Sequence, residues 1–133
     1  MSNELSPADK IEIAELFARY SHTVDHGETD AWVGLFAADG TFEIVGVTRL
    51  EGREQLRGMP AMLTDTGKGK WRHQLTDIVS DAADGGATAK AYGLVTDWGA
   101  GGKAVTFAEY EARLRRIGGE WRFAQMTARM ATG

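Results

Sequence analysis

Residues 108–115 read Ala-Glu-Tyr-Glu-Ala-Arg-Leu-Arg, so that small or apolar side chains alternate with charged ones. Successive side chains of a strand point to opposite faces of a sheet, so the uncharged residues share one face and the charged residues share the other. We therefore predict a strand over residues 103–117, with one face buried in a core and one face in water.

The stretches around this strand extend it into a meander. Three more strands are predicted, at residues 71–80, 87–98 and 121–130. Glycine-rich turns separate consecutive strands, as in antiparallel hairpins. Upstream, we predict a strand over residues 41–47, a return at residues 49–52, and a helical pattern that Pro60 interrupts.

The N-terminal part of the chain is helical in pattern. Ser6 as N-cap, Pro7 at the first helical position and Asp9 three residues after the cap predict where a helix begins. Gly27 is a natural left-handed stop, so this helix should end near Asp25. One buried stripe is predicted from apolar residues at three- and four-residue steps: Ile13, Phe17, Tyr20 and Val24. A second short helix is expected within residues 28–36, before a turn at residues 38–40.

Helices followed by a meander predict an α+β fold, with the N-terminal helices packed on one face of a strongly curved, mostly antiparallel sheet. A chain of 133 residues is sufficient for a single domain, which we place at residues 1–133. The chain has no Cys, and neither a secretion signal nor a membrane span is recognisable, so a cytoplasmic protein that does not enter a membrane is expected. The net charge is −4 and the basic residues are scattered, which argues against a nucleic-acid partner.

Small side chains gather on the strand beside residues 108–115. They occupy alternate positions, at Ala87, Ala89, Ala91 and Gly93. Such residues let a helix approach the sheet closely, or they leave room for a small molecule in a cavity. The sequence alone leaves both interpretations open.

Asp25 and His73 are the candidates for chemistry. Asp25 ends the first helix, where the helix dipole disfavours a carboxylate by about 0.3 to 1 kcal/mol at an exposed site, so a compensating neighbour is expected. His73 shares a strand face with Trp71 and Leu75. A carboxylate that accepts from one ring nitrogen fixes the tautomer and leaves the other nitrogen free to take a proton. The alternative is a solvated helix-end Asp and a histidine that only packs in the core.

A metal site was the competing hypothesis for this helix end. His22 and His26 have the four-residue spacing of two zinc ligands on one helix face, but Thr23 stands where the zinc-protease motif has Glu. We predict no metal. We also predict no cofactor, because the glycine-rich residues 99–102 precede a strand and not a phosphate-binding helix.

Four stretches of the chain together carry a family resemblance. They are Tyr-Ser-His-Thr-Val-Asp at residues 20–25, Trp-Val-Gly-Leu-Phe-Ala-Ala-Asp-Gly-Thr-Phe at 32–42, Trp-Arg-His at 71–73 and Gly-Glu-Trp-Arg-Phe at 119–123. In these stretches the chain resembles the SnoaL-like branch of the nuclear-transport-factor-type superfamily, over nearly its whole length. The resemblance implies a cone-shaped α+β barrel whose open mouth holds a ligand.

The resemblance also implies roles for particular residues. Dehydratase and dehydrochlorinase members use an Asp near the end of the first helix and a His that opens the meander, which are Asp25 and His73 here. Tyr20 is similar to a tyrosine that assists catalysis in the bile-acid dehydratase, although five residues on an ideal helix turn by about 140°, so Tyr20 and Asp25 should converge only if the helix end is distorted. Ala91 and Met126 stand where scytalone dehydratase has a second His and the dehydrochlorinase has an Arg, which argues against either substrate.

The resemblance implies a cofactor-independent enzyme, either a lyase of the dehydratase type or an isomerase or cyclase, that acts on a small, apolar, cyclic molecule. His73, Asp25 and Tyr20 are its predicted catalytic residues. The predicted substrate-binding residues are Val24, Phe42, Leu50, Trp71, Ala91, Tyr110 and Met126.

The alternative is a non-catalytic member of the same fold, either a small-molecule-binding protein or an assembly subunit. In both cases a homodimer or homotrimer is expected, formed through the sheet face that carries Tyr92 and Leu94.

Overall fold

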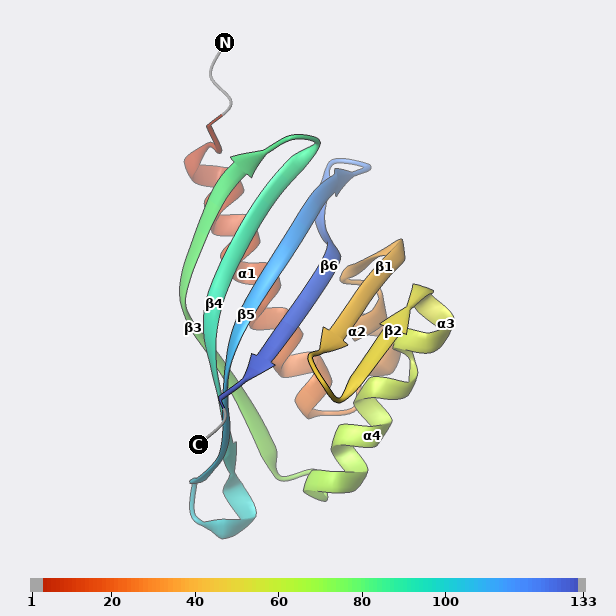
Figure 1. Ribbon diagram of the computed structural model, residues 1–133, viewed down its shortest axis with the longest axis vertical. Coiled ribbons are helices and arrows are strands. Elements are labelled where there is room, and N and C mark those ends of the chain that lie inside the picture. The colour runs from red at the N-terminus through yellow and green to blue at the C-terminus, as the bar shows by residue number, and fades with distance from the viewer. Residues whose placement is uncertain (1–3, 132–133) are drawn as a thin grey trace.

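The structure is a computed structural model that describes residues 4–131, and its helices pack against one six-stranded sheet (Figure 1). The helices are α1 (Pro7–Asp25), α2 (Thr29–Val33), α3 (Gly52–Leu56) and α4 (Gly58–Gly67), with a short 3₁₀ turn η1 at Trp98–Ala100. The strands are β1 (Phe36–Ile44), β2 (Thr48–Glu51), β3 (Trp71–Ala83), β4 (Gly86–Asp97), β5 (Lys103–Ile117) and β6 (Glu120–Met130). The predicted α+β fold is confirmed.

The strands are arranged in the order β2-β1-β6-β5-β4-β3. All neighbours are antiparallel except β1 and β6, which run parallel. The long strands bend strongly, and α1 lies across one face of them, while α2, α3 and α4 gather near β1 and β2 (Figure 1). The helices therefore cover one face of the sheet, and the opposite sheet face remains uncovered by helices.

The start of α1 is fixed by the predicted cap. The Ser6 hydroxyl accepts from the Asp9 amide at 3.0 Å, and the Asp9 carboxylate accepts from the Ser6 amide at 3.1 Å. Asp9 also accepts from Arg116 and from the indole of Trp121, at 2.5 and 3.0 Å. These bonds hold the pKa of Asp9 well below its usual value, chiefly through Trp121 and then Arg116. One carboxylate thus both caps the helix and ties it to β5 and β6.

Two predicted boundaries around the first strand are wrong. The expected turn at residues 38–40 lies inside β1, which begins at Phe36 and not at residue 41. The pairing with β6 shifts register between Phe36 and Thr41, so the chain kinks without leaving the sheet. Gly40 permits that kink, because a Cβ there would lie 2.9 Å from the carbonyl oxygen of Ala37.

The predicted break at Pro60 is also wrong in position. The helical stretch is interrupted at Arg57, between α3 and α4, and Pro60 is the third residue of α4. Proline is tolerated in the first turn of a helix, because an amide there has no partner within the helix.

The buried face predicted for the meander is confirmed. Ala108, Tyr110, Ala112 and Leu114 of β5 are buried, as are Ala87, Ala89 and Ala91 of β4. These side chains belong to the same core cluster as Ile13, Phe17 and Tyr20 of α1. At the far end of β3, the Lys10 ammonium donates to the Ser80 carbonyl at 2.6 Å. The small residues of β4 thus belong to the same core as α1, which itself packs on β3 and β6.

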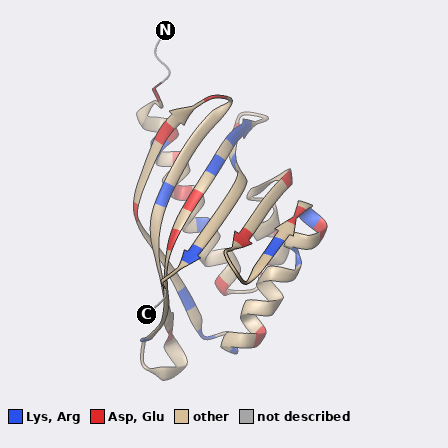
Figure 2. Cartoon of the chain, viewed as in Figure 1, with Lys and Arg blue, Asp and Glu red and all other residues tan. Residues whose placement is uncertain are grey.

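Charged side chains are dispersed over the outside of the molecule. Figure 2 shows Lys and Arg interspersed with Asp and Glu along the strands and helices. Within residues 4–131, no helix is both long enough and apolar enough to cross a membrane.

Candidate active site

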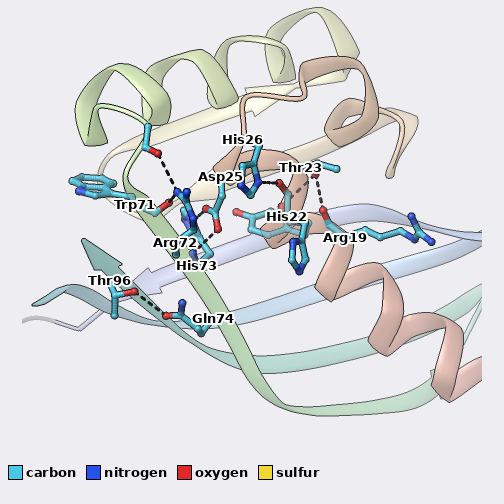
Figure 3. A network of polar contacts seen from close by, with 12 residues as sticks. Arg19, His22, Thr23, Asp25, His26, Trp71, Arg72, His73, Gln74 and Thr96 are labelled. Atoms are coloured by element: carbon cyan, nitrogen blue, oxygen red, sulfur yellow. Dashed lines mark hydrogen bonds and ion pairs between the residues drawn. The ribbon is translucent and has the colours of Figure 1, made fainter. Parts of the chain in front are cut away.

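Asp25 and His73 meet through two hydrogen bonds, although 48 residues separate them (Figure 3). One carboxylate oxygen of Asp25 lies 2.6 Å from His73 Nδ1, and the other accepts from the His73 backbone amide at 2.8 Å. Their side chains are only 5 % and 7 % exposed, respectively. The expected contact between the two residues is therefore present, in a shielded place.

The secondary structure brings this pair together. Asp25 is the last residue of α1, and Gly27, two residues later, takes the left-handed φ of 65° that turns the chain away. His73 is the third residue of β3. Since α1 packs along β3, the end of the helix lies over the start of the strand. The two donors of His73 also supply the compensation that Asp25 needs at the negative end of the helix dipole.

The start of β3 is held on its other side by Arg72. Its guanidinium donates to the carbonyls of Gly69 and Trp71, at 3.1 and 2.8 Å (Figure 3). The guanidinium also lies 5.1 Å from the ring centre of Trp98. All of these contacts are made by Arg72, the residue directly before His73. They restrict the backbone that carries the imidazole.

The two nitrogens of the His73 ring have different surroundings. Nδ1 faces the Asp25 carboxylate, which can only accept while it is ionised, so Nδ1 carries the proton. Within residues 4–131, no hydrogen-bond partner is found for Nε2. In that tautomer, Nε2 has a free lone pair, which is the requirement for a general base.

Two tyrosines complete the polar group around this base. The rings of Tyr20 and His73 lie 6.2 Å apart, and those of Tyr20 and Tyr110 lie 5.9 Å apart. Burial, the neighbouring Tyr110 and the Asp25 charge raise the pKa of Tyr20 well above its usual value. Burial raises the pKa of Tyr110 to about 12, against the opposing effect of its hydrogen bond with Tyr20. Both phenols therefore stay protonated, and, since one of them donates to the other, one O–H remains available as a donor.

The expected distortion of the helix end is absent. α1 is one α-helix from Pro7 to Asp25, yet Tyr20 and Asp25 both contact His73. Tyr20 reaches the imidazole from more than one turn earlier because its side chain is long, and the two rings form a T-shaped pair with an interplanar angle of 78°. A rotation of about 140° separates the Cβ directions of Tyr20 and Asp25, but the long phenol side chain bridges that angle.

The residues predicted to bind substrate lie around this group at different depths. Val24, Phe42, Ala91, Tyr110 and Met126 are buried, while Leu50 and Trp71 are partly exposed. The Phe42 ring stacks on Tyr20 with a centroid distance of 6.1 Å. Phe42 pairs with Leu50 on one side and with Met126 on the other. Ala91 pairs with Tyr110, and the Trp71 indole packs against Gly67 at the end of α4.

Sequence reasoning missed several apolar residues of this region. Partly buried side chains that pack on the core are Ile44, Leu63 and Leu75, and Val95 lies opposite His73 in the β3–β4 ladder. Strand alternation could have identified two of them. Ile44 lies two residues after Phe42 and Leu75 lies two residues after His73, so each shares a strand face with a predicted site residue. Leu63 could not be placed without knowing where α4 packs.

The interior beside the dyad is filled mainly by aromatic rings. Tyr20 lies within 5.9 to 6.4 Å, between ring centres, of Trp32, Phe42, Tyr110 and Phe123. Tyr20, Asp25 and His73 line none of five hollows on the described surface.

The histidines of the competing metal hypothesis lie apart from the dyad. His22 and His26 are exposed, and His26 Nδ1 lies 2.8 Å from the carbonyl oxygen of His22 (Figure 3). Asp25 turns toward His73 instead of toward them. Among residues 4–131, no three His, Asp or Glu side chains are grouped so that they could hold a metal ion.

Comparison with known proteins identifies relatives over nearly the full chain. The family profile of the SnoaL-like domain matches residues 6–127. No curated protein matches the chain significantly.

Solved structures share the fold closely. A protein of unknown function with a cystatin-like fold from Nostoc punctiforme is 25% identical, with a TM-score of 0.88 over 98% of this chain and 96% of that chain. A protein of unknown function from Mycobacterium tuberculosis is 30% identical, with a TM-score of 0.79 over 96% of this chain and 78% of that one. A candidate scytalone dehydratase from Novosphingobium aromaticivorans is 14% identical, with a TM-score of 0.77 over 94% and 85% of the two chains, and shares the fold alone.

Proposed function

The chain belongs to the SnoaL-like domain family, and on that premise we propose that it is a cofactor-independent enzyme that removes a proton from a small, apolar, cyclic molecule. His73 is the general base, and Asp25 positions it. The reaction is an elimination of the dehydratase type, or an isomerisation or cyclisation that begins with the same proton transfer. The observation that carries the proposal is the pair of hydrogen bonds from His73 to one shielded carboxylate.

The dyad accounts for the first step. Nε2 of His73 takes a proton from a carbon next to a carbonyl group of the substrate, and the electron pair of that C–H bond moves toward the carbonyl oxygen. The Asp25 carboxylate stabilises the imidazolium that forms, since it already accepts from Nδ1. A positioned base of this kind contributes typically 10²- to 10⁴-fold to the rate.

The tyrosine pair supplies the complementary donor. A phenol O–H of Tyr20 or Tyr110 donates to the oxygen on which negative charge develops. In an elimination, a phenol protonates the departing hydroxyl, which leaves as water. The proton on His73 then passes through water to the phenolate, so that both groups return to their starting forms. In an isomerisation, His73 returns its proton to a different carbon. The raised pKa values keep both donors protonated near neutral pH.

Proton abstraction can be tested before the natural substrate is known. 2-Tetralone is an apolar bicyclic ketone with acidic C–H groups, and exchange of these protons in D₂O is followed by NMR. The wild-type protein should accelerate the exchange, and His73→Gln should lose about 10² to 10⁴ of that acceleration. His22→Gln is the matched control, because His22 is an exposed histidine on α1 without a contact to the dyad. Equal acceleration by the wild type and His73→Gln contradicts the proposal.

The second candidate is a non-catalytic binding protein of the same fold. The close packing of aromatic rings around Tyr20 favours it, because a packed interior offers little room for turnover. For such a protein we expect 2-tetralone to bind without any exchange that depends on His73. His73→Gln would then change only the stability of the protein.

A further inference from the structure

Trp32 carries a buried hydrogen-bond donor that has no partner. Its side chain on α2 is 0% exposed, and no acceptor within residues 4–131 reaches its indole Nε1–H. The great majority of buried polar groups in native proteins are paired, and an unpaired donor destabilises the folded state. An unpaired donor at this depth therefore needs an explanation.

The surroundings of Trp32 connect it to the dyad. Its indole contacts the rings of Phe36, Phe42 and Tyr20, with centroid distances of 4.8, 5.8 and 5.9 Å. Tyr20 in turn lies 6.2 Å from the His73 ring. Trp32 and His73 are thus both neighbours of the same phenol ring.

A second unpaired polar atom lies at the same end of α1. The buried hydroxyl of Thr64, on α4, also lacks a partner among the described residues. It lies 3.3 Å from the position that a Cβ would take on Gly27, two residues after Asp25. α2 and α4 both pack on α1, so the helices that surround the Asp25 end of α1 carry both unpaired groups.

We propose that the Trp32 indole N–H binds the ligand, by donating a hydrogen bond to an oxygen of the molecule on which His73 acts. This inference rests on the proposed function and adds a specificity-determining residue to it. The rings of Phe36, Phe42 and Tyr20 contact the apolar body, and Trp32 selects a molecule that carries a hydrogen-bond acceptor. An analogue without that acceptor leaves the buried donor unpaired and binds more weakly.

Two probes with nearly the same bicyclic body separate this hydrogen bond from apolar contact. 2-Tetralone carries a carbonyl oxygen, and tetralin lacks it. The chain has 4 Trp, and the indole N–H resonance that disappears in Trp32→Phe identifies Trp32 in the NMR spectrum. We expect 2-tetralone to shift that resonance and tetralin to leave it in place. In Trp32→Phe, the Kd for 2-tetralone should rise about five- to tenfold, while the Kd for tetralin stays unchanged.

Trp121→Phe is the matched control, because the Trp121 indole already donates to Asp9 at 3.0 Å. This variant should keep the affinity for 2-tetralone. The proposal is overturned if the Trp32 resonance of the wild type is unmoved at millimolar 2-tetralone, if both probes shift it equally, or if Trp32→Phe binds 2-tetralone normally. Where Trp32→Phe folds poorly, the Trp32 resonance is the one that remains in each of Trp71→Phe, Trp98→Phe and Trp121→Phe, and the wild-type spectra then decide the question.

The outcome is separable from that of the base mechanism. If exchange of 2-tetralone depends on His73 while the Trp32 resonance is silent, the proposed function stands and the role of Trp32 is refuted. If the Trp32 resonance responds and no exchange occurs, Trp32 binds a ligand and the catalytic proposal fails.

Discussion

Asp25 is suited to its place because it offers two acceptors to one neighbour. Its two oxygens accept from the ring and from the backbone of His73, so the imidazole cannot rotate without losing a bond. The residue at the end of α1 would otherwise face the unpaired carbonyls of the helix. Only an ionised carboxylate satisfies both donors, since an amide has a single oxygen and a protonated acid brings a donor of its own.

Asp25→Asn should therefore reverse the tautomer of His73. With the one amide oxygen on the backbone N–H, the side-chain NH₂ faces Nδ1, which must then accept, and the proton moves to Nε2. We expect exchange of 2-tetralone to fall by about 10²-fold or more, and stability to fall by about 1 to 3 kcal/mol. Nitrogen-15 NMR of the imidazole reports which nitrogen is protonated.

Asp30→Asn is the control for this change, because Asp30 is an exposed helix residue whose carboxylate pairs with Arg57 at 2.7 Å and not with the dyad. It should keep both the tautomer and the exchange rate. A wild-type tautomer and rate in Asp25→Asn would contradict the role given to Asp25.

The residues of the site could be predicted from sequence in part. The helix dipole predicted that Asp25 has a compensating partner, and the strand pattern made His73 a candidate. Only the family resemblance identified Asp25 and His73 as a pair. Tyr20 contacts His73 from an undistorted helix, which helical rotation alone does not predict because it ignores the reach of a long side chain. The unpaired indole N–H of Trp32 could not be predicted, because the spacing of Trp32 from neighbouring apolar residues is that of any buried helix residue.

At the scale of elements, Tyr110 of β5 is positioned by Gly93 of β4, which has no side chain and so leaves room for the phenol ring. The Tyr110 ring lies over Gly93, where an added Cβ would come within 2.3 Å of a ring carbon. The backbone conformation at position 93 does not require glycine, since its φ is not positive. Its conformational cost in the strand is balanced by the close packing of the phenol on the backbone.

Gly93→Ala should displace the Tyr110 ring. We expect the free energy of unfolding to fall by about 1 to 3 kcal/mol, as for other overpacked core positions. Urea unfolding measures this loss. Gly58→Ala is the control, because a Cβ on that residue of α4 meets nothing within 4 Å and improves helix propensity. A loss in Gly93→Ala no larger than that of the control would show that the ring adjusts freely.

The elements also show why some boundaries were predictable and others were not. The cap at Ser6 and the stop at Gly27 are local signals, and α1 has the predicted bounds. β5 likewise spans the predicted residues, since alternation is local. The parallel pairing of β1 with β6 joins residues far apart in the chain. Because of this pairing, residues 38–40 lie within a strand and do not form the predicted turn. No local sequence pattern indicates such a long-range pairing.

The whole molecule leaves one face of its sheet free of helices, and we predict that a second copy covers it. Tyr92 and Phe107 on this face are 57% and 56% exposed, and both line a hollow of about 580 Å³. An apolar surface of this kind is typical of an association site. Sedimentation velocity should show a dimer or a trimer, and Tyr92→Glu with Phe107→Glu should give a monomer. Ile11→Glu changes an exposed residue of α1 and should leave the assembly intact; a monomeric wild type would contradict this prediction.

Stability at high pH reports on the two buried phenols. A phenol with a raised pKa keeps its proton in the folded state at pH values where the unfolded chain has lost it, so the free energy of unfolding falls as pH rises. For Tyr110 this decline begins near its ordinary value of 10.0 and extends to about 12, which corresponds to about 2 to 3 kcal/mol. Tyr20, whose pKa is also raised, adds to it in the same direction. Urea unfolding at pH values on both sides of this window measures the decline. Tyr110→Phe should flatten it, because phenylalanine has no proton to lose, and an equally steep decline in that variant would place the alkaline instability elsewhere in the protein.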